Sequence, residues 1–230
     1  MGPLTPLEVE ALGLSLRVAL WSVATSLPLG LLVAWLLARR DFLGKSALNA
    51  VVHLPLVLPP VVVGYLLLVL LGREGPLGRL LLHLFGVTLP FTWQGAALAA
   101  AVMAFPLMVR AMRLSLEAVD RRLEAAARTL GARPWTVFLT VTLPLMAPGI
   151  LVGALLAFAR SLGEFGATIT FAANIPGETR TLPLALYTLV QTPGGEAGAY
   201  RLAGLSVLLA LAALGASELL ARRLRLRIDG

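Results

Sequence analysis

The sequence predicts an all-α integral membrane protein with five transmembrane helices. Of its 230 residues, 58% are hydrophobic and 13% are charged, and the mean hydropathy is +0.88, whereas soluble domains carry about 25% charged residues. A transmembrane helix needs about 20 mostly apolar residues to cross a hydrocarbon layer of roughly 30 Å. Five runs meet that length: Leu12–Leu37, Ala50–Leu71, Leu89–Val109, Leu145–Glu164 and Leu202–Leu220. A soluble helical protein is excluded because such apolar helices would need a far larger hydrophilic shell.

Two further apolar segments are too short to cross. Arg79–Phe85 is expected to lie along the membrane interface or against other helices. Thr181–Gln191, about ten residues long, is expected to be interfacial or re-entrant, and would make a sixth transmembrane helix if it crossed. No linker or change in composition divides the chain, so residues 1–230 are predicted to form a single transmembrane domain.

The positions of the basic residues predict the topology. Thirteen of the nineteen Lys and Arg side chains fall in alternate loops, after the first span, after the third and at the C-terminus, and four fall on the other side. Cytoplasmic loops carry an excess of Lys and Arg. The N-terminus is therefore expected outside and the C-terminus in the cytoplasm, which agrees with an odd number of spans. Because topology accounts for the net charge of +7, no nucleic-acid partner is predicted.

The loop between the third and fourth spans, about residues 115–146, is predicted to form a helix, a turn and a second helix. Leu123–Leu130 contains strong helix formers, Gly131 is suited to a left-handed helix end, and Pro134 is suited to a first helical position. Ala125, Ala126 and Ala127 give the first helix a small-residue face. A partner protein could pack on this face, or the hairpin could be a solvated loop without a partner.

Polar residues at membrane depth are the candidates for a pathway or gate. An Arg at the centre of a span costs about 2.5–3.5 kcal/mol on insertion scales, so Arg160 should face protein or water. Glu164 lies one helical turn later, and the two form either a structural ion pair or part of the pathway. The other candidates are neutral hydrogen-bonding groups that could contact an oxyanion or a backbone carbonyl: Ser161, Thr168 and Asn174.

No catalytic or metal site is predicted. The chain has no cysteine and two isolated histidines, so it offers neither a thiolate ligand set nor a nucleophile with a base and an orienting group. No cofactor is expected on this chain, and an enzyme acting on lipid is disfavoured.

The hairpin resembles the cytoplasmic signature of ABC importer permeases, in which Glu-Ala-Ala is followed by Gly and then by Ile-x-Leu-Pro. The matching positions here are Ala126, Ala127, Gly131, Leu143 and Pro144. This chain departs from the pattern at Ala125, where the family has Glu and where Glu124 is displaced by one position, and at Val141, where the family has Ile.

The resemblance covers nearly the whole chain and is nearest to the molybdate/tungstate permease subunits. It is carried by Pro28–Ala38, His53–Gly64, Ser161–Thr168, Asn174–Gly177 and Thr181–Leu184. It implies a permease homodimer in the cytoplasmic (inner) membrane of a prokaryote, with an ATPase-coupling loop that contains Glu124. Two cytoplasmic ABC ATPase subunits would bind ATP and Mg, and a periplasmic or lipid-anchored protein would deliver the oxyanion. The alternatives are a permease for sulfate or another oxyanion, and a membrane assembly protein without a transport role.

Overall fold

The structure, a computed structural model, describes residues 4–228, and this part of the chain is helical and contains no strand. Its helices follow one another in the order α1 (Pro6–Arg39), α2 (Lys45–Val57), α3 (Pro60–Leu71), α4 (Pro76–Phe85), α5 (Trp93–Ala118), α6 (Arg121–Thr129), α7 (Pro134–Val137), the π-helical turn η1 (Phe138–Thr142), α8 (Leu143–Leu162), α9 (Gly166–Phe171), α10 (Leu182–Gln191) and α11 (Glu196–Ile228). The predicted all-α fold is confirmed.

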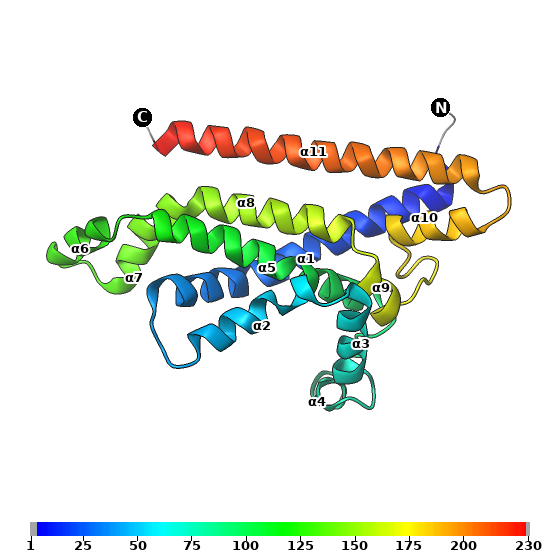
Figure 1. Cartoon of the computed structure of the whole chain (residues 1–230), viewed down its shortest axis with the longest axis horizontal. Coiled ribbons are helices and arrows are strands. Elements are labelled where there is room, and N and C mark those ends of the chain that lie inside the picture. Colours follow the sequence, from blue (N-terminus) through cyan, green and yellow to red (C-terminus); the bar gives the residue numbers. More distant parts are fainter. Residues whose placement is uncertain (1–3, 229–230) are drawn as a thin grey trace.

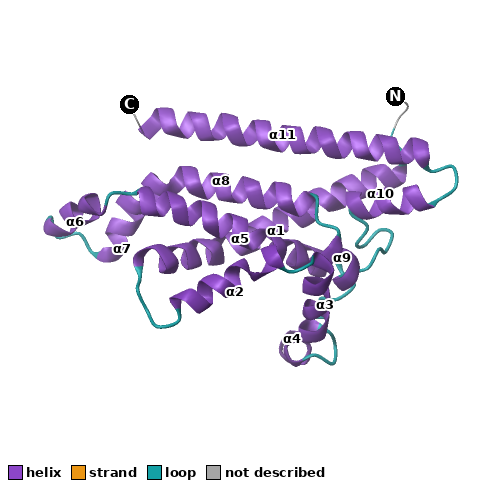
Figure 2. Ribbon diagram, in the orientation of Figure 1, coloured by secondary structure: helices purple, strands orange, loops and turns teal. Residues whose placement is uncertain are grey.

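The long helices α1, α5, α8 and α11 run along the long axis of the molecule (Figure 1). Helix α5 packs against α1 and α8, and α11 packs against α8 and α10. The α6 and α7 segments lie at one end of this bundle, where α11 also ends, and the start of α1 lies with α10 at the opposite end (Figures 1 and 2). The two ends of the described chain therefore lie at opposite ends of the bundle, as an odd number of crossings requires.

Four helices of the described chain are long and apolar enough to cross a membrane, and a bent pair could make a fifth. The predicted second span, Ala50–Leu71, corresponds to this bent pair and is not one straight helix. That segment forms α2 and α3, which meet at an angle of 118°. Pro59 has an extended backbone and precedes the first residue of α3, Pro60. Two consecutive prolines supply no backbone N–H to continue the hydrogen bonds of α2, so the helix stops and changes direction.

The two short apolar segments form short helices. Helices α4 and α10 each contain ten residues, about half the length needed to cross. Thr181–Gln191 therefore does not add a sixth crossing by length. Gly86 ends α4 in a left-handed conformation with φ of 66°, which glycine adopts without steric cost.

The first and last spans begin earlier than predicted, and polar contacts explain the extra length. Thr5 and Glu8 form a reciprocal capping box at the start of α1, which satisfies backbone N–H groups that the first turn leaves unpaired. The buried carboxylate of Glu8 also accepts a hydrogen bond from Arg201 Nε at 2.9 Å. This ion pair ties the first turns of α11 to the start of α1.

Small residues and methionines build the core between α1, α5 and α8. Alanine is the commonest residue at the buried positions of α5, and its small side chain lets neighbouring helices approach closely. On α8, Gly149 and Gly153 face α5, and a Cβ atom at Gly149 would lie 2.1 Å from Ser115 Cβ. The largest buried side chains of this core are Leu37, Met108, Met112, Leu116 and Met146.

Candidate functional site

The loop that joins α5 to α8 forms the predicted helix–turn–helix, which we call the α6–α7 hairpin (residues 121–137). Asp120 begins α6 as its N-cap, and its side chain accepts a hydrogen bond from the backbone N–H of Arg122 at 2.9 Å. Gly131 adopts a φ of 84° just after α6 ends, and Pro134 is the first residue of α7. The predicted turn chemistry is therefore confirmed at both positions.

The second arm of the hairpin continues into the membrane helix without a break. Residues Pro134–Leu162 form one helical segment, in which the π-helical turn η1 connects α7 to α8. Leu143 and Pro144 lie at the start of α8. Because the helix is continuous, a displacement of α7 is transmitted directly to α8.

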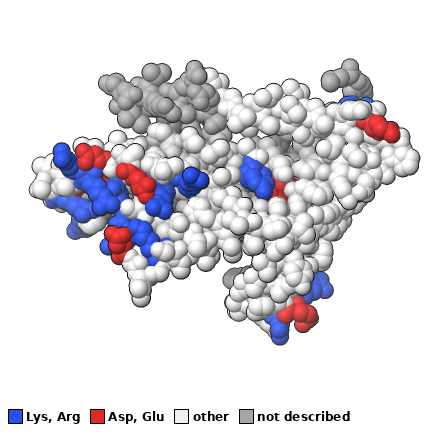
Figure 3. Space-filling model, viewed as in Figure 1, with Lys and Arg blue, Asp and Glu red and all other residues white. Residues whose placement is uncertain are grey.

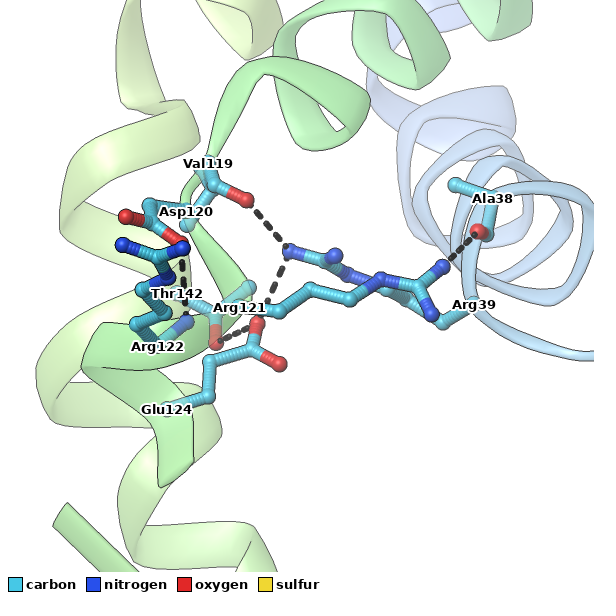
Figure 4. A network of polar contacts seen from close by, with 8 residues as sticks. All are labelled: Ala38, Arg39, Val119, Asp120, Arg121, Arg122, Glu124 and Thr142. Atoms are coloured by element: carbon cyan, nitrogen blue, oxygen red, sulfur yellow. Dashed lines mark hydrogen bonds and ion pairs between the residues drawn. The ribbon is translucent and has the colours of Figure 1, made fainter. Parts of the chain in front are cut away.

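Glu124 holds the first arm of the hairpin to the helix bundle (Figure 4). Its Oε1 atom accepts hydrogen bonds from Arg39 Nη2 at 3.0 Å and from Thr142 Oγ1 at 2.9 Å. Arg39 Nη2 also donates to the carbonyl oxygen of Val119 at 3.2 Å. The ion pair is largely shielded, with the Arg39 and Glu124 side chains 9% and 14% exposed. One carboxylate thus joins α6 to the end of α1 and to η1.

The sequence marked Glu124 as displaced from its family position, but it did not identify Arg39 and Thr142 as its partners. Arg39 looks like one of several topology-determining charges at the end of the first span, and Thr142 is one of several threonines in the stretch before the fourth span. No sequence signal connects positions 85 and 18 residues away from Glu124. The contact exists only because α1 and η1 meet beside α6.

The outer surface of the hairpin is apolar in places where a solvated loop would be polar. Of the three alanines predicted to form a small-residue face, Ala125 and Ala126 are exposed and Ala127 is half-buried. Beyond them, Leu130 is 88% exposed and Trp135 is 69% exposed. Large exposed apolar side chains at a hairpin tip indicate a surface that packs against a partner.

At the other end of α8, Arg160 and Glu164 form an ion pair. Arg160 Nη1 lies 2.6 Å from Glu164 Oε2, and the Glu164 side chain is 2% exposed. This approach is a charge contact and not an aligned hydrogen bond, because Glu164 Oε2 has no hydrogen-bond partner among the described residues. The second oxygen, Oε1, accepts a hydrogen bond from the backbone N–H of Ala167 at 2.8 Å. Glu164 therefore bridges the end of α8 and the start of α9.

The remaining pathway candidates fall into separate surroundings. Ser161 is buried, and its hydroxyl lies 2.9 Å from that of Ser22 on α1. Thr168 is fully buried in α9, and its Oγ1 has no hydrogen-bond partner within residues 4–228.

Asn174 lies apart from this group, in the loop after α9. Its Oδ1 accepts from Arg180 Nε at 3.0 Å, and its Nδ2 donates to Thr188 Oγ1 at 2.8 Å. Arg160, Ser161, Glu164 and Thr168 thus cluster where α8 gives way to α9, and Asn174 ties a different loop to α10. A role in a pathway stays a prediction for all five.

A family model described as "Binding-protein-dependent transport system inner membrane component" matches residues 26–226, which is most of the chain. The chain belongs to this family of membrane permeases. The α6–α7 hairpin and the long helices on either side of it lie within the matched region.

Two relatives with high sequence identity to this permease are described as molybdenum permeases. The chain is 64% identical over 219 residues to the molybdenum transport system permease protein ModB of Escherichia coli (strain K12), covering 95% of this chain and 96% of that protein. It is 57% identical over 222 residues to ModB of Haemophilus influenzae, with 96% and 97% covered. The sulfate transport system permease protein CysW of Synechococcus elongatus is 40% identical over 201 residues, with 86% and 70% covered. The resemblance to molybdate permeases is confirmed, and the sulfate alternative is weaker.

The fold of this permease also matches solved ABC importers. A bacterial ABC transporter involved in the import of the acidic polysaccharide alginate superposes with a TM-score of 0.75 at 17% identity, covering 96% of this chain and 80% of that chain. At that identity the match shows a shared fold.

Proposed function

We propose that this chain is the permease subunit of an ATP-driven importer that moves molybdate, and the chemically similar tungstate, across the cytoplasmic membrane by alternating access. The observation that carries the proposal is the 64% identity to a molybdenum permease over 95% of the chain. The 40% identity to a sulfate permease supports the same class of cargo, a tetrahedral oxyanion. It supports sulfate as the cargo less strongly than the 64% identity supports molybdate.

In the proposed assembly two copies of this chain form one pathway. Two cytoplasmic ABC ATPase subunits bind ATP and Mg and perform hydrolysis, so this chain is not itself an enzyme. A periplasmic or lipid-anchored binding protein delivers the oxyanion on the opposite side. A related fold has been solved as an alginate ABC transporter in complex with its loaded periplasmic protein, which supports this type of partnership. The N-terminus lies outside and the α6–α7 hairpin and C-terminus face the cytoplasm.

The geometry of the hairpin supports its role in coupling hydrolysis to movement. Its exposed alanines and Leu130 offer the ATPase a small-residue face with an apolar side chain beside it. When the ATPases close, the displaced hairpin moves α8 through the continuous helix from Pro134. The Glu124–Arg39 ion pair makes the end of α1 move with it. The two long helices then rotate as rigid bodies and change the side on which the pathway opens.

Vesicles test this proposal most directly. The permease is reconstituted in liposomes with its ATPase and binding protein, and uptake of labelled molybdate is measured with and without ATP. We expect ATP-dependent uptake that unlabelled tungstate suppresses and that a large excess of sulfate leaves largely intact. Suppression by sulfate equal to that by tungstate would assign the cargo to the sulfate alternative. A permease that copurifies with no ATPase and shows no ATP-dependent uptake would favour the assembly role.

A further inference from the structure

A cavity of about 520 Å³ lies between the end of α1 and the α6–α7 hairpin. This volume falls within the roughly 300–1,000 Å³ typical of ligand sites. Its apolar lining is formed by Leu31, Leu32 and Trp35 of α1 with Trp135 of α7 and Phe138 of η1. Glu124 and Thr142, which form the contact between α6 and η1, also lie in its lining, whereas none of the five pathway candidates does.

The mouth of the cavity is basic. Arg40 and Arg128 line the cavity, and both also line an adjoining hollow of about 480 Å³ that adds Arg39 and Arg121. The one carboxylate in either lining belongs to Glu124, and its Oε1 already accepts two hydrogen bonds. Arg40 and Arg128 form no ion pair with any residue in the described part of the chain. The mouth thus has positive charge available for an anion. Lys and Arg side chains gather at this end of the molecule (Figure 3).

The length of the cavity matches one membrane leaflet. It follows α1 from Arg40 back to Pro28, which is about 18 Å at a rise of about 1.5 Å per residue. Half of the hydrocarbon layer is roughly 15 Å thick. If the apolar part of the cavity lies beside the acyl chains of one leaflet, the arginines at its mouth therefore lie at the level of the headgroups of that leaflet.

We propose that this cavity binds an anionic phospholipid, with the phosphate at Arg40 and Arg128 and an acyl chain along the apolar face of α1. Basic pockets between transmembrane helices are suited to such headgroups. A free oxyanion, whether phosphate or the transported cargo, would form ion pairs with the arginines. It would gain no binding energy from the two tryptophans and the leucines, because it has no apolar surface to bury against them. The bound lipid would join the end of α1 to the hairpin beside the Glu124–Arg39 ion pair.

Native mass spectrometry of the full-length permease in detergent first tests the site without the ATPase or the binding protein, so lipid binding is measured independently of the transport proposal, and the ATPase is added only in a final step. Phosphatidylglycerol and phosphatidylcholine with matched acyl chains are titrated separately. We expect the wild type to retain one phosphatidylglycerol per protomer well above the phosphatidylcholine background. Arg40→Gln with Arg128→Gln should weaken phosphatidylglycerol about thirtyfold, since each basic residue near an anionic lipid contributes about fivefold.

The matched control is Arg122→Gln with Arg133→Gln, which removes the same charge from two exposed residues of the hairpin region that line neither hollow. This control should bind phosphatidylglycerol as the wild type does. The single change Arg128→Gln, at a residue with no ion pair among those described, should weaken binding about fivefold and serves if the double variant misfolds.

Four results would overturn the proposal. Equal retention of the two lipids, or equal loss in the control variant, would indicate nonspecific binding. Displacement of phosphatidylglycerol by millimolar phosphate or molybdate would indicate a site for a free oxyanion. Loss of the lipid when the ATPase is added would show that the basic mouth is a protein-docking surface.

Discussion

At the scale of single residues, the charged groups of this membrane protein are paired in two distinct ways. Arg39 and Glu124 join segments far apart in the sequence, whereas Arg160 and Glu164 are four residues apart, and Glu164 lies just beyond the end of α8 rather than on the same helix face as predicted. Both pairs are shielded from water on at least one side. Removing one partner of a shielded pair leaves an uncompensated charge, which costs more than the pair itself contributes. The same change in an exposed pair costs little.

The Glu124 ion pair leads to a prediction about stability. Glu124→Ala should lower the free energy of unfolding by about 3 kcal/mol, because Arg39 would remain buried without its carboxylate. Glu117→Ala is the control, since Glu117 pairs with Arg113 in a more exposed position and should cost about 0.5 kcal/mol. Unfolding in detergent measures both variants. Equal effects of the two variants would show that the Glu124 pair does not hold the hairpin.

The ion pair at the other end of α8 predicts an energetic coupling. Arg160→Met should destabilise the protein, because the buried Glu164 carboxylate loses its counter-charge. Adding Glu164→Gln should recover part of that loss, because a glutamine can still accept the hydrogen bond from Ala167 but carries no charge. Melting curves of the wild type, the two single variants and the double variant give the coupling energy. Additive effects would indicate that the two residues act separately and would favour a role in the pathway.

At the scale of elements, the approach of α8 to α5 depends on glycine. A Cβ at Gly149 would lie 2.1 Å from Ser115 Cβ and 2.5 Å from its Oγ. Real Cβ atoms do not approach side chains so closely, so any larger residue must separate the two helices. Proline has a different effect, because it ends or bends a helix. At the corner between α2 and α3, Pro59 and Pro60 separate two helices that meet at 118°.

Gly149→Ala should therefore destabilise the protein by about 1–3 kcal/mol, the usual cost of overpacking. Adding Ser115→Gly should recover part of the loss, because it removes the atoms in the way. Gly204→Ala is the control: a Cβ at Gly204 of α11 would meet nothing within 4 Å, and alanine is the better helix former. Thermal unfolding in detergent measures the series. A stable Gly149→Ala protein would mean that α5 and α8 separate at no cost.

The hairpin predicts a loss of coupling without a loss of folding. Gly131 has a positive φ and open space around its Cβ position. Gly131→Val should therefore act only through backbone strain, on the order of 1 kcal/mol or more, and redirect α7. Ala126→Trp should block close packing on the exposed face of α6. Both variants should insert and dimerise, yet lose ATPase copurification and the stimulation of hydrolysis by loaded binding protein.

The controls for this experiment are Gly131→Asn and Ala197→Trp. Asparagine tolerates the left-handed conformation, and Ala197 is an exposed residue at the opposite end of the molecule. Both controls should retain ATPase binding. Normal copurification and normal stimulated hydrolysis in Gly131→Val and Ala126→Trp would exclude the hairpin as the coupling element.

At the scale of the whole molecule, the basic residues predict which end of the bundle faces the cytoplasm. Ala126 lies at the α6 end and Ala197 at the opposite end, and both are exposed. The chain has no cysteine, so single cysteines at these positions give a clean test. An impermeant thiol reagent added to intact spheroplasts should label Ala197→Cys, and should label Ala126→Cys only after the membrane is disrupted. The reverse pattern would invert the proposed orientation.

The sequence by itself determined the class of fold, the positions of the long helices and the shape of the hairpin. These features depend on local physics: apolar runs must lie in lipid, Gly131 permits a positive φ and Pro134 starts a helix. The family motif, read along the chain, also marked the hairpin as the candidate coupling element. What it could not determine was the angle between the two halves of Ala50–Leu71. Pro59 and Pro60 mark where the helix stops, but the 118° turn depends on how α3 packs against α5 and α9.

Only the tertiary structure decided which polar residues meet. Glu124 connects α6 to α1 and η1 because Arg39 and Thr142 donate hydrogen bonds to it. The cavity between the end of α1 and the hairpin exists because residues of α1 and α7 line the same space. The pathway candidates, which look alike as polar residues at membrane depth, separate into a cluster at the α8–α9 junction and the Asn174 network. The physical reason is that contact energies depend on distances in space, and the helix crossings that bring distant positions together leave no periodic or local signal in the sequence.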